Sequence, residues 1–394
     1  MHALQPIAED PTTLGTALRD VDRPVAEARG LPNLCYTSRD HLALERERVF
    51  FRNWACVGFA KDVPEPGDAR PVDLLGAPLF VVRDRGGGGV RAFHNVCSHR
   101  GMVLVERPTT FRTVIRCPYH SWCYGLDGGL RSTPHIGGPG RNEHEGFDRA
   151  RHGLREVRAA VWFDLIFVNV AGTAPPFEEV IRPLAERWRE FDPAALRHGG
   201  AGSSIRFDVR CNWKLAVENY CESYHLPWVH PGLNSYSRLE DHYDIVEPGR
   251  FSGQGSAVYN PPLAEDGRRL PCFRGLSRRW DTAAEYVAIY PNALVGIHRD
   301  HFFGIHLEPV GTDRTVERIE IYYAGDDAPG DGYAGLRAKL AASWHAVFGE
   351  DILVVEGMQR GRASPAFAGG VFSPAMDAAP HCFHRWVAGE LGRR

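Results

Sequence analysis

Two short pairs of cysteine and histidine constrain this 394-residue chain more strongly than any other feature. Cys97 and His99 are separated by one residue, Cys117 and His120 by two, and 17 residues lie between the pairs. Each pair supplies one thiolate and one imidazole. Four such ligands can hold a tetrahedral zinc ion, or a two-iron cluster with both cysteines on one iron and both histidines on the other. The pattern therefore predicts a metal centre built from two loops.

The residues around these pairs favour one of the two centres. The first pair continues as Cys-Ser-His-Arg-Gly, and residues 117–128 read Cys-Pro-Tyr-His-Ser-Trp-Cys-Tyr-Gly-Leu-Asp-Gly. These segments resemble the two cluster-binding loops of the Rieske family. Cys123 also lies in the second loop, and we interpret it as a packing residue rather than a ligand. The resemblance implies a Rieske [2Fe–2S] cluster, rather than zinc, bound by Cys97, His99, Cys117 and His120.

Charge and hydrophobicity exclude several classes of protein. The 46 basic and 49 acidic residues give a formal net charge of -3, whereas a nucleic-acid-binding surface needs a basic excess. Residues 1–30 lack the apolar core of a signal peptide, and the most apolar stretch, 159–171, is interrupted by Asp164 and too short to span a bilayer. We therefore expect a cytoplasmic protein with no nucleic-acid or membrane partner. In a reducing compartment, clustered cysteines indicate metal binding sooner than disulfides.

The pattern of apolar residues changes along the chain. From about residue 54 to 167, short apolar runs separated by Gly, Pro and Asp predict a mostly antiparallel β module, and Pro175-Pro176 marks its end. The second half mixes both periodicities, which predicts an α+β fold. Its expected strands are 205–209, 285–290, 293–298, 302–307 and 316–324, and its expected helices are 177–191, 211–226, 333–348 and 351–360.

A second metal-ligand pattern lies in the second half. His225 and His230 are five residues apart, so they diverge by about 140° on a helix, but Pro227 is expected to end the helix and let His230 fold back. Two imidazoles and one carboxylate form the facial triad of non-haem Fe(II) oxygenases. Asp351, which we expect at the start of a helix, can supply the carboxylate, with the neighbouring Glu350 and Glu356 as competitors.

The surrounding residues carry a second resemblance. Asn-Trp-Lys at 212–214, then Glu-Asn, Glu222 and Tyr-His, with a further histidine five residues on, resemble the mononuclear-iron motif of the Rieske non-haem iron oxygenases, large (α) subunit. The resemblance implies that His225, His230 and Asp351 bind Fe(II). It also implies an antiparallel β Rieske domain inserted in an α+β helix-grip catalytic domain. The expected boundaries are 1–45 for an N-terminal segment packing on the catalytic domain, 46–170 for the Rieske domain and 171–394 for the catalytic domain.

Glu222 receives its own role from this resemblance. It precedes His225 by three residues, and we expect the two on one helical face. In the family, the acid at this position hydrogen-bonds a cluster histidine of a neighbouring subunit, which implies a homotrimer. Many ring-dihydroxylating members have Asp here. The glutamate resembles the branch that acts on choline, glycine betaine, carnitine and proline betaine.

These features lead to a hypothesis about the reaction. Electrons pass singly from the Rieske cluster through Glu222 to the iron, where O2 is activated and a small-molecule substrate is hydroxylated or oxidatively N-demethylated. The chain has no G-x-G-x-x-G after a strand, so NAD(P)H and flavin are expected only through a separate flavin or ferredoxin reductase. Alternatives are an aromatic acid or natural-product intermediate as substrate, or an electron carrier without oxygenase activity.

A quaternary ammonium substrate would need an aromatic cage, because aromatic rings attract a cation that cannot donate hydrogen bonds. One of three nearby histidines, at 298, 301 and 306, could also face the substrate. The candidates for the cage are Trp228, Tyr236, Tyr243, Tyr259, Phe273, Tyr286, Tyr290, Phe302 and Phe303.

Overall fold

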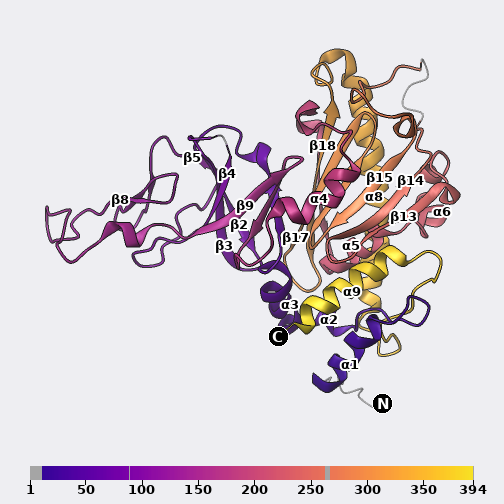
Figure 1. Cartoon of the computed structure of the whole chain (residues 1–394), viewed down its shortest axis with the longest axis horizontal. Helices are drawn as coiled ribbons and strands as arrows, with labels where there is room; N and C mark the ends of the chain where they lie inside the picture. Colours follow the sequence, from indigo (N-terminus) through magenta and orange to yellow (C-terminus); the bar gives the residue numbers. More distant parts are fainter. Residues whose placement is uncertain (1–10, 88, 262–266, 394) are drawn as a thin grey trace. The chain divides into compact units, whose positions relative to one another are not determined.

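The computed structural model describes residues 11–87, 89–261 and 267–393. The chain forms two compact units, one from Phe50–Phe177 and the other from Met1–Val49 with Glu178–Arg394 (Figure 1). The first ten residues of the expected N-terminal segment lie outside the described residues. All named strand pairs are antiparallel, and among the described residues the α-helices belong almost entirely to the larger unit, which confirms the predicted α+β class. Within the described residues, none of the helices has the length and apolarity needed to cross a membrane.

The smaller unit is built from two antiparallel sheets. Its strands arise from short β-branched and aromatic runs, and β1 and β10 are buried along their whole length. The larger sheet has the order β1 (Ala55–Phe59), β10 (Leu165–Asn169), β9 (Glu156–Trp162), β4 (Val90–His94), β3 (Ala77–Arg83), β2 (Asp68–Leu74) and β5 (Thr109–Thr110). The smaller has the order β6 (Ile115–Arg116), β7 (Cys123–Tyr124) and β8 (Leu130–Ser132).

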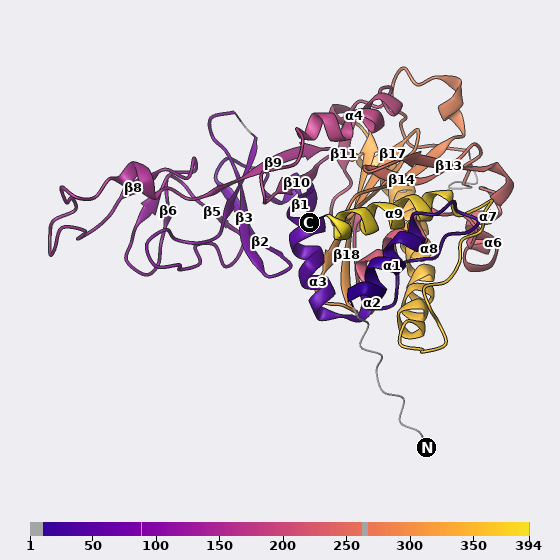
Figure 2. The ribbon, with the colours of Figure 1, turned by 60° about the horizontal axis from the view of Figure 1, so that its bottom comes forward.

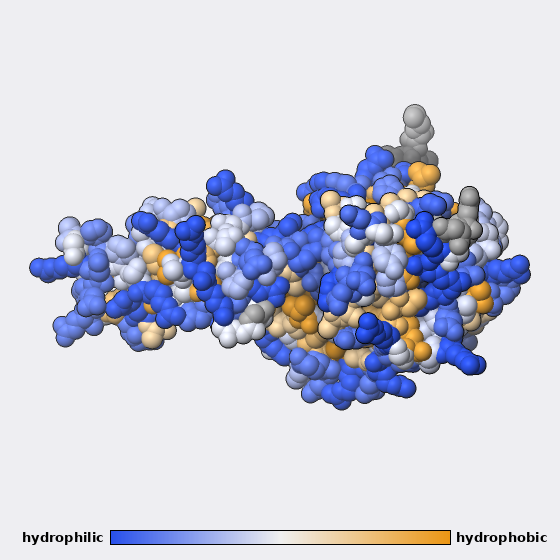
Figure 3. All heavy atoms as spheres, turned by 90° about the horizontal axis from the view of Figure 1, so that it is seen from above, coloured by the Kyte–Doolittle hydropathy of each residue, from blue (hydrophilic) through white to orange (hydrophobic). Residues whose placement is uncertain are grey.

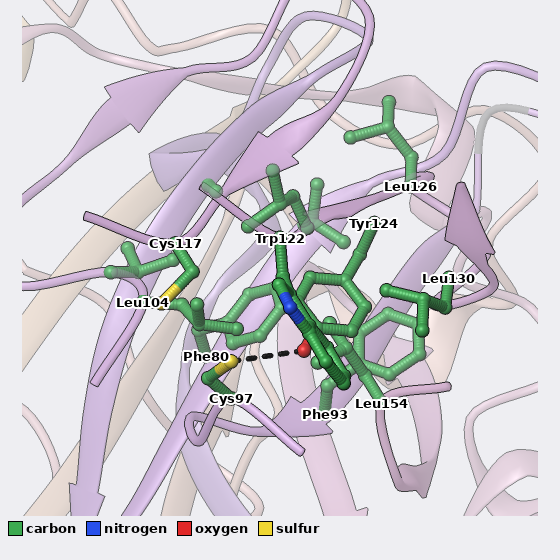
Figure 4. Packing of buried hydrophobic residues seen from close by; sticks show 14 residues of the cluster. Phe80, Phe93, Cys97, Leu104, Cys117, Trp122, Tyr124, Leu126, Leu130 and Leu154 are labelled. Atoms are coloured by element: carbon green, nitrogen blue, oxygen red, sulfur yellow. Dashed lines mark hydrogen bonds between the residues drawn. The ribbon is translucent and has the colours of Figure 1, made fainter. Parts of the chain in front are cut away.

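One apolar cluster joins these two sheets (Figure 4). Phe80 and Phe93 from the larger sheet stack at 5.4 Å between ring centroids, and Trp122 and Tyr124 enter the same cluster from the second loop. Gly128 passes so close to Phe93 that a Cβ there would lie 2.5 Å from the ring, and its φ of +81° also favours glycine. Burial of these side chains therefore fixes the loops of the smaller unit on its sheet.

The larger unit is built on an eight-stranded sheet. Its order is β11 (Leu196–His198), β18 (Thr315–Ala324), β17 (His301–Pro309), β16 (Ala293–Ile297), β15 (Ala284–Ile289), β14 (Phe251–Ser256) and β13 (His242–Glu247), and β12 (Ser204–Val209) also pairs with β18. The helices are α1 (Pro11–Val21), α2 (Leu34–Thr37), α3 (Arg39–Glu45), α4 (Phe177–Arg187), α5 (Trp213–Cys221), α6 (Leu226–Val229), α7 (Pro231–Asn234), α8 (Ala334–Gly361) and α9 (Ala378–Gly392).

The register of the central strands places one row of side chains under the helices. Gln254 of β14 lies opposite Tyr286 of β15, which lies opposite Gly296 of β16, which lies opposite Phe303 of β17. Because paired residues share a face of the sheet, this row forms a continuous floor. A Cβ on Gly296 would lie 2.3 Å from the Phe303 ring, so only a glycine leaves room for the ring at this position.

Two helix predictions were wrong in ways that affect the site. Helix α5 ends at Cys221 rather than Leu226, because Glu222 is extended and its carboxylate accepts the backbone N–H of His225, capping the next turn. Gln254 donates to the Glu222 carbonyl that the helix leaves unpaired.

The segments 333–348 and 351–360 form one continuous helix, α8, with Asp351 in its interior. The glycine at position 349 lowers helix propensity by only about 1 kcal/mol. Burial of the large side chains of Trp344 and Phe348 outweighs that penalty. Asp351 is consequently held by helical turns on both sides.

The N-terminal segment is tied to α5 and to the C-terminal helix. Lys214 and Glu45 are both fully buried and form an ion pair of 2.6 Å, and Trp213 donates its indole N–H to the same carboxylate. Helices α1 and α9 lie side by side in both ribbon views (Figure 2). Figure 3 shows one face of the molecule, where hydrophilic residues predominate but apolar residues gather in the middle of the wider part. The start and end of the larger unit thus close around the helix that precedes His225.

Candidate active site

The four cluster-ligand candidates come together in the smaller unit. Cys97 and Cys117 are 2% and 1% exposed, and neither forms a disulfide. The His99 and His120 rings lie 4.7 Å apart between centroids. Within the described residues, the buried Nδ1 of His120 has no hydrogen-bond partner, as expected of a nitrogen reserved for a metal.

The two loops share one backbone design. In the first, Cys97 donates to the Met102 carbonyl and accepts from the Gly101 N–H; in the second, Cys117 bonds Trp122 and Ser121 in the same way. Gly101 and Ser121, each four residues after its cysteine, have φ values of +76° and +59°. Both loops therefore turn back at the same point and present one thiol and one imidazole each.

The surroundings of these ligands suit a buried cluster. Trp122 stacks on His99 with 4.5 Å between centroids, and the Tyr124 hydroxyl lies 3.0 Å from Cys97 Sγ (Figure 4). Burial raises the pKa of the Cys117 thiol, so its thiolate needs the compensating charge of a metal. Two sulfurs and two imidazoles with no carboxylate among them match a cluster with mixed ligation. Cys123 instead lies 3.3 Å from the Ser121 carbonyl.

The second group of ligand candidates lies in the larger unit. One nitrogen each from His225 and His230 and one oxygen from Asp351 lie within 4.8 Å of one another. Asp351 Oδ1 is 3.0 Å from Nε2 of His230 and 3.7 Å from Nε2 of His225. His225 precedes α6 and His230 joins α6 to α7, whereas Asp351 comes from α8. Two imidazoles and a carboxylate at this spacing can hold a divalent metal ion with open positions.

Each imidazole is oriented by its own glutamate. Nδ1 of His225 lies 2.5 Å from Glu222, and Nδ1 of His230 lies 2.6 Å from Glu350. A carboxylate that accepts the Nδ1–H turns Nε2 toward the metal position and increases its basicity. Burial disfavours protonation of His230, but Asp351 and Glu350 outweigh this effect and raise its pKa.

The structure also separates Asp351 from its competitors. Glu350 faces the opposite ring nitrogen of His230 from the one that Asp351 faces. Glu356 accepts hydrogen bonds from Arg210, which lower the pKa of that carboxyl. Glu222 contacts His225 without sharing a helix with it, so the expected common helical face was wrong although the contact forms.

A narrow pocket of about 50 Å³ opens beside this triad. Of the expected cage residues, Tyr286 and Phe303 line it, whereas Trp228 is 71% exposed and Tyr259 lines a different cavity. Its full lining is Asn219, Tyr220, His225, Leu226, His230, Leu233, His242, Gln254, Tyr286, Phe303, Trp344, Val347, Phe348 and Asp351.

The sequence reasoning missed three aromatic residues of the pocket: Tyr220, Trp344 and Phe348. Trp344 and Phe348 precede Asp351 by seven and three residues, a spacing that places all three on one face of a continuous helix. That signal was hidden by splitting α8 at Gly349. Burial raises the pKa of Tyr220 and of Tyr286 well above the usual value, so both phenols are neutral.

Comparisons with known proteins match both parts of the chain to described families. Residues 196–392 match the family described as "Ring hydroxylating alpha subunit (catalytic domain)", and residues 53–141 match "Rieske [2Fe-2S] domain". The chain is 28% identical to a choline monooxygenase of Beta vulgaris, covering 98% of this chain and 82% of that protein. It is 26% identical to the oxygenase subunit of a carnitine monooxygenase of Escherichia coli, covering 87% of each.

Solved structures share the fold. A quaternary ammonium Rieske monooxygenase in complex with L-carnitine aligns with a TM-score of 0.74 at 22% identity, over 94% of this chain and 97% of that one. Naphthalene 1,2-dioxygenase from Rhodococcus sp. aligns with a TM-score of 0.72 at 19% identity, over 96% and 97%. The chain therefore belongs to the ring-hydroxylating α-subunit family and is the large subunit of a Rieske non-haem iron oxygenase, with a [2Fe–2S] domain and a mononuclear-iron catalytic domain.

Proposed function

We propose that this protein is the oxygenase component of a monooxygenase that hydroxylates or oxidatively N-demethylates a small quaternary ammonium compound. The observation that carries the proposal is the pocket beside Asp351, which five aromatic residues line and to which the described residues contribute no Lys or Arg. A methylated ammonium group binds to aromatic faces through cation–π attraction, worth about 2 kcal/mol or more when desolvated. The related choline and carnitine monooxygenases support the same substrate class.

The proposal assigns a role to each ligand candidate. Cys97, Cys117, His99 and His120 hold the cluster, and His225, His230 and Asp351 hold the iron. When bound, the cluster supplies single electrons and the iron supplies the activation of O2. Glu222 and Glu350 hold the Nδ1 protons of the two imidazoles and so fix their Nε2 atoms. The apolar walls exclude water from the substrate methyl groups.

Glu222 has a second proposed role in electron transfer between copies of the chain. Its side chain is 15% exposed, and the neighbouring Tyr224 and Trp228 are 46% and 71% exposed with their rings in contact at 5.9 Å. Exposed aromatic pairs of this kind are typical of interfaces. We infer a homotrimer in which a cluster histidine of the next copy reaches Glu222, and a separate flavin or ferredoxin reductase that supplies the electrons.

The test compares charged and neutral substrates of one shape. Choline, carnitine, glycine betaine and an uncharged analogue with a tert-butyl group in place of trimethylammonium are each incubated with the holoenzyme, a reductase and O2. Formaldehyde or hydroxylated product is then measured. We expect turnover of a methylammonium compound, and about tenfold or more weaker turnover of its neutral analogue. Turnover of aromatic acids alone would overturn the proposal.

Metal analysis tests the ligand roles separately. Wild-type protein should contain three irons per chain, and Asp351→Ala should contain two with an unchanged Rieske absorption spectrum. Loss of the spectrum together with the third iron would indicate general misfolding. Retention of the third iron would move the carboxylate ligand to another residue. A wild-type protein with only two irons would instead favour an electron carrier.

A further inference from the structure

A second cavity, of about 240 Å³, lies in the larger unit next to the active-site pocket. We refer to it as the outer cavity. Histidines 298 and 301, which the proposed function does not use, both line it together with Asp300. His298 is 1% exposed and His301 is fully buried. Two buried histidines on the wall of a polar cavity need a physical explanation.

These histidines form one wall with residues that line the active-site pocket. The Tyr286 hydroxyl lies 3.2 Å from Nε2 of His298, and the Trp344 indole N–H donates to Nε2 of His301 at 2.9 Å. Tyr286 and Trp344 line the active-site pocket, whereas His298 and His301 line the outer cavity. At each of these two places, a single hydrogen-bonded pair of side chains therefore separates the active-site pocket from the outer cavity.

The two histidines differ in the protonation states that their partners allow. An indole is only a donor, so Nε2 of His301 must accept and its proton lies on Nδ1, where Asp300 accepts it at 2.6 Å. His301 is thus confined to one tautomer. The partner of His298 Nε2 is a hydroxyl, which donates or accepts equally well, so His298 can adopt either neutral tautomer.

The other ring nitrogen of His298, Nδ1, is buried beside the outer cavity. Among the described residues, no group hydrogen-bonds its Nδ1 atom, although that atom is buried. A buried polar atom is costly without a partner, and water in the adjoining outer cavity can supply one. Burial, helped by His301 and Arg299, lowers the pKa of His298 well below the usual value, so the ring is neutral at rest.

We propose that His298 and Tyr286 relay a proton from the outer cavity into the active-site pocket during turnover. This inference rests on the proposed function, because monooxygenation consumes two protons: R–H, O2, two electrons and two protons give R–OH and water. The reductase supplies both electrons. In the relay, Nδ1 of His298 takes a proton from water, its Nε2 proton moves to the Tyr286 oxygen, and the Tyr286 hydroxyl proton enters the pocket.

The relay delivers one proton per turnover and leaves both side chains neutral, and the hydroxide formed in the outer cavity is neutralised by exchange with solvent. Only N–H and O–H bonds break and form, and His298 ends as the neutral Nδ1–H tautomer with Tyr286 donating to Nε2. After product leaves, the relay resets in the opposite direction. The Tyr286 hydroxyl gives its proton to Nε2 of His298 and takes a new proton from solvent in the open pocket. Nδ1 of His298 then returns its proton to the outer cavity. The second proton of the reaction comes by another route.

The first test needs neither substrate nor turnover. Protein that keeps its Rieske cluster, is depleted of the mononuclear iron and carries ¹⁵N-labelled histidine is examined by NMR, and the His298 signals are assigned by their loss in His298→Gln. We expect the His298 nitrogens to report both tautomers, and His301, the internal control, to report only the Nδ1–H form. Tyr286→Phe should shift the His298 signals. A single fixed His298 tautomer would overturn the relay and leave the proposed function intact.

The second test uses the holoenzyme with a substrate that wild type turns over. His298→Gln should lower kcat about 100-fold with KM unchanged, because general acid–base steps contribute at least that factor and His298 does not line the pocket. The matched control is His345→Gln, at an exposed histidine of the same unit that lines neither cavity, and it should change little. In His298→Gly, added imidazole should restore turnover and the wild-type solvent isotope effect. Normal kcat in His298→Gln would refute the relay, whereas a wild type inactive on every methylammonium compound would refute the proposed function.

Discussion

Replacing Glu350 by alanine should weaken Fe(II) binding although Glu350 is not a proposed ligand. Glu350 and Asp351 are consecutive on α8, yet they address opposite nitrogens of one imidazole, at 2.6 Å and 3.0 Å. Without Glu350, the His230 ring loses the acceptor that fixes its orientation. Loss of such a partner typically lowers metal affinity 10- to 100-fold, which is about 1.4–2.7 kcal/mol.

The exposure of Glu350 decides whether the loss of Fe(II) affinity lies nearer 10-fold or nearer 100-fold. Its side chain is 42% exposed, whereas Glu222, which holds the other imidazole, is only 15% exposed. Solvent screens the more exposed carboxylate, and water can replace it as an acceptor. We therefore expect about a tenfold loss for Glu350→Ala. Glu350→Gln should lose less, since its amide oxygen still accepts the Nδ1–H.

The assay is competition for Fe(II) between iron-depleted protein and a chromophoric chelator, with the Rieske absorption as a measure of folding. Glu356→Ala is the matched control, because Glu356 lies on the same helix but pairs with Arg210. Its affinity for Fe(II) should equal that of wild type. An unchanged affinity in Glu350→Ala, or an equal loss in both variants, would refute the reasoning that Glu350 acts through His230.

Three further predictions concern stability and electron transfer. Lys214→Met should lower the free energy of unfolding by about 3–5 kcal/mol in urea titrations, since it leaves Glu45 charged and buried, and Glu45→Gln in the same chain should restore part of the loss. Burial and the charge of Lys214 lower the pKa of His41 to about 4, below its unfolded value of about 6.5, so the stability that its neutral form contributes is lost as pH falls from 6.5 to 4. His41→Gln should therefore reduce the loss of unfolding free energy over this pH range by up to about 3 kcal/mol. The same loss in wild type and variant would contradict this prediction. Glu222→Gln should keep both metals, because its amide still accepts from His225, but should stop multiple turnovers; wild-type turnover would exclude the electron-transfer role.

The cluster loops were predictable because each is nearly self-contained. Cys97 and His99 share one turn, which closes through hydrogen bonds to Gly101 and Met102 a few residues away. The candidate ligands and their spacing are thus visible within one short segment, and the second loop has the same pattern of backbone hydrogen bonds. What the sequence did not show is how closely Trp122 and Tyr124 pack against these ligands.

The pocket was less predictable because its residues come from distant segments. Tyr286 and Phe303 were among nine aromatic candidates, and only the strand register, through Gly296, sets them in one row. Trp344 and Phe348 join them because α8 continues through Gly349, where single-residue propensity suggested a break. Packing against the sheet, which propensity does not include, decided the outcome.

The amino-acid sequence by itself indicated the two sets of candidate ligands and the two-part organisation, since closely spaced Cys and His residues lie within single loops. Only the tertiary structure decided which nitrogen of His230 each of the two carboxylates, Asp351 and Glu350, contacts. Asp351 lies 121 residues from His230, and the packing of α8 turns Asp351 to Nε2 and Glu350 to Nδ1 of the same ring. Such assignments depend on the helix rotation and strand register that the whole core fixes, and no local sequence pattern encodes them.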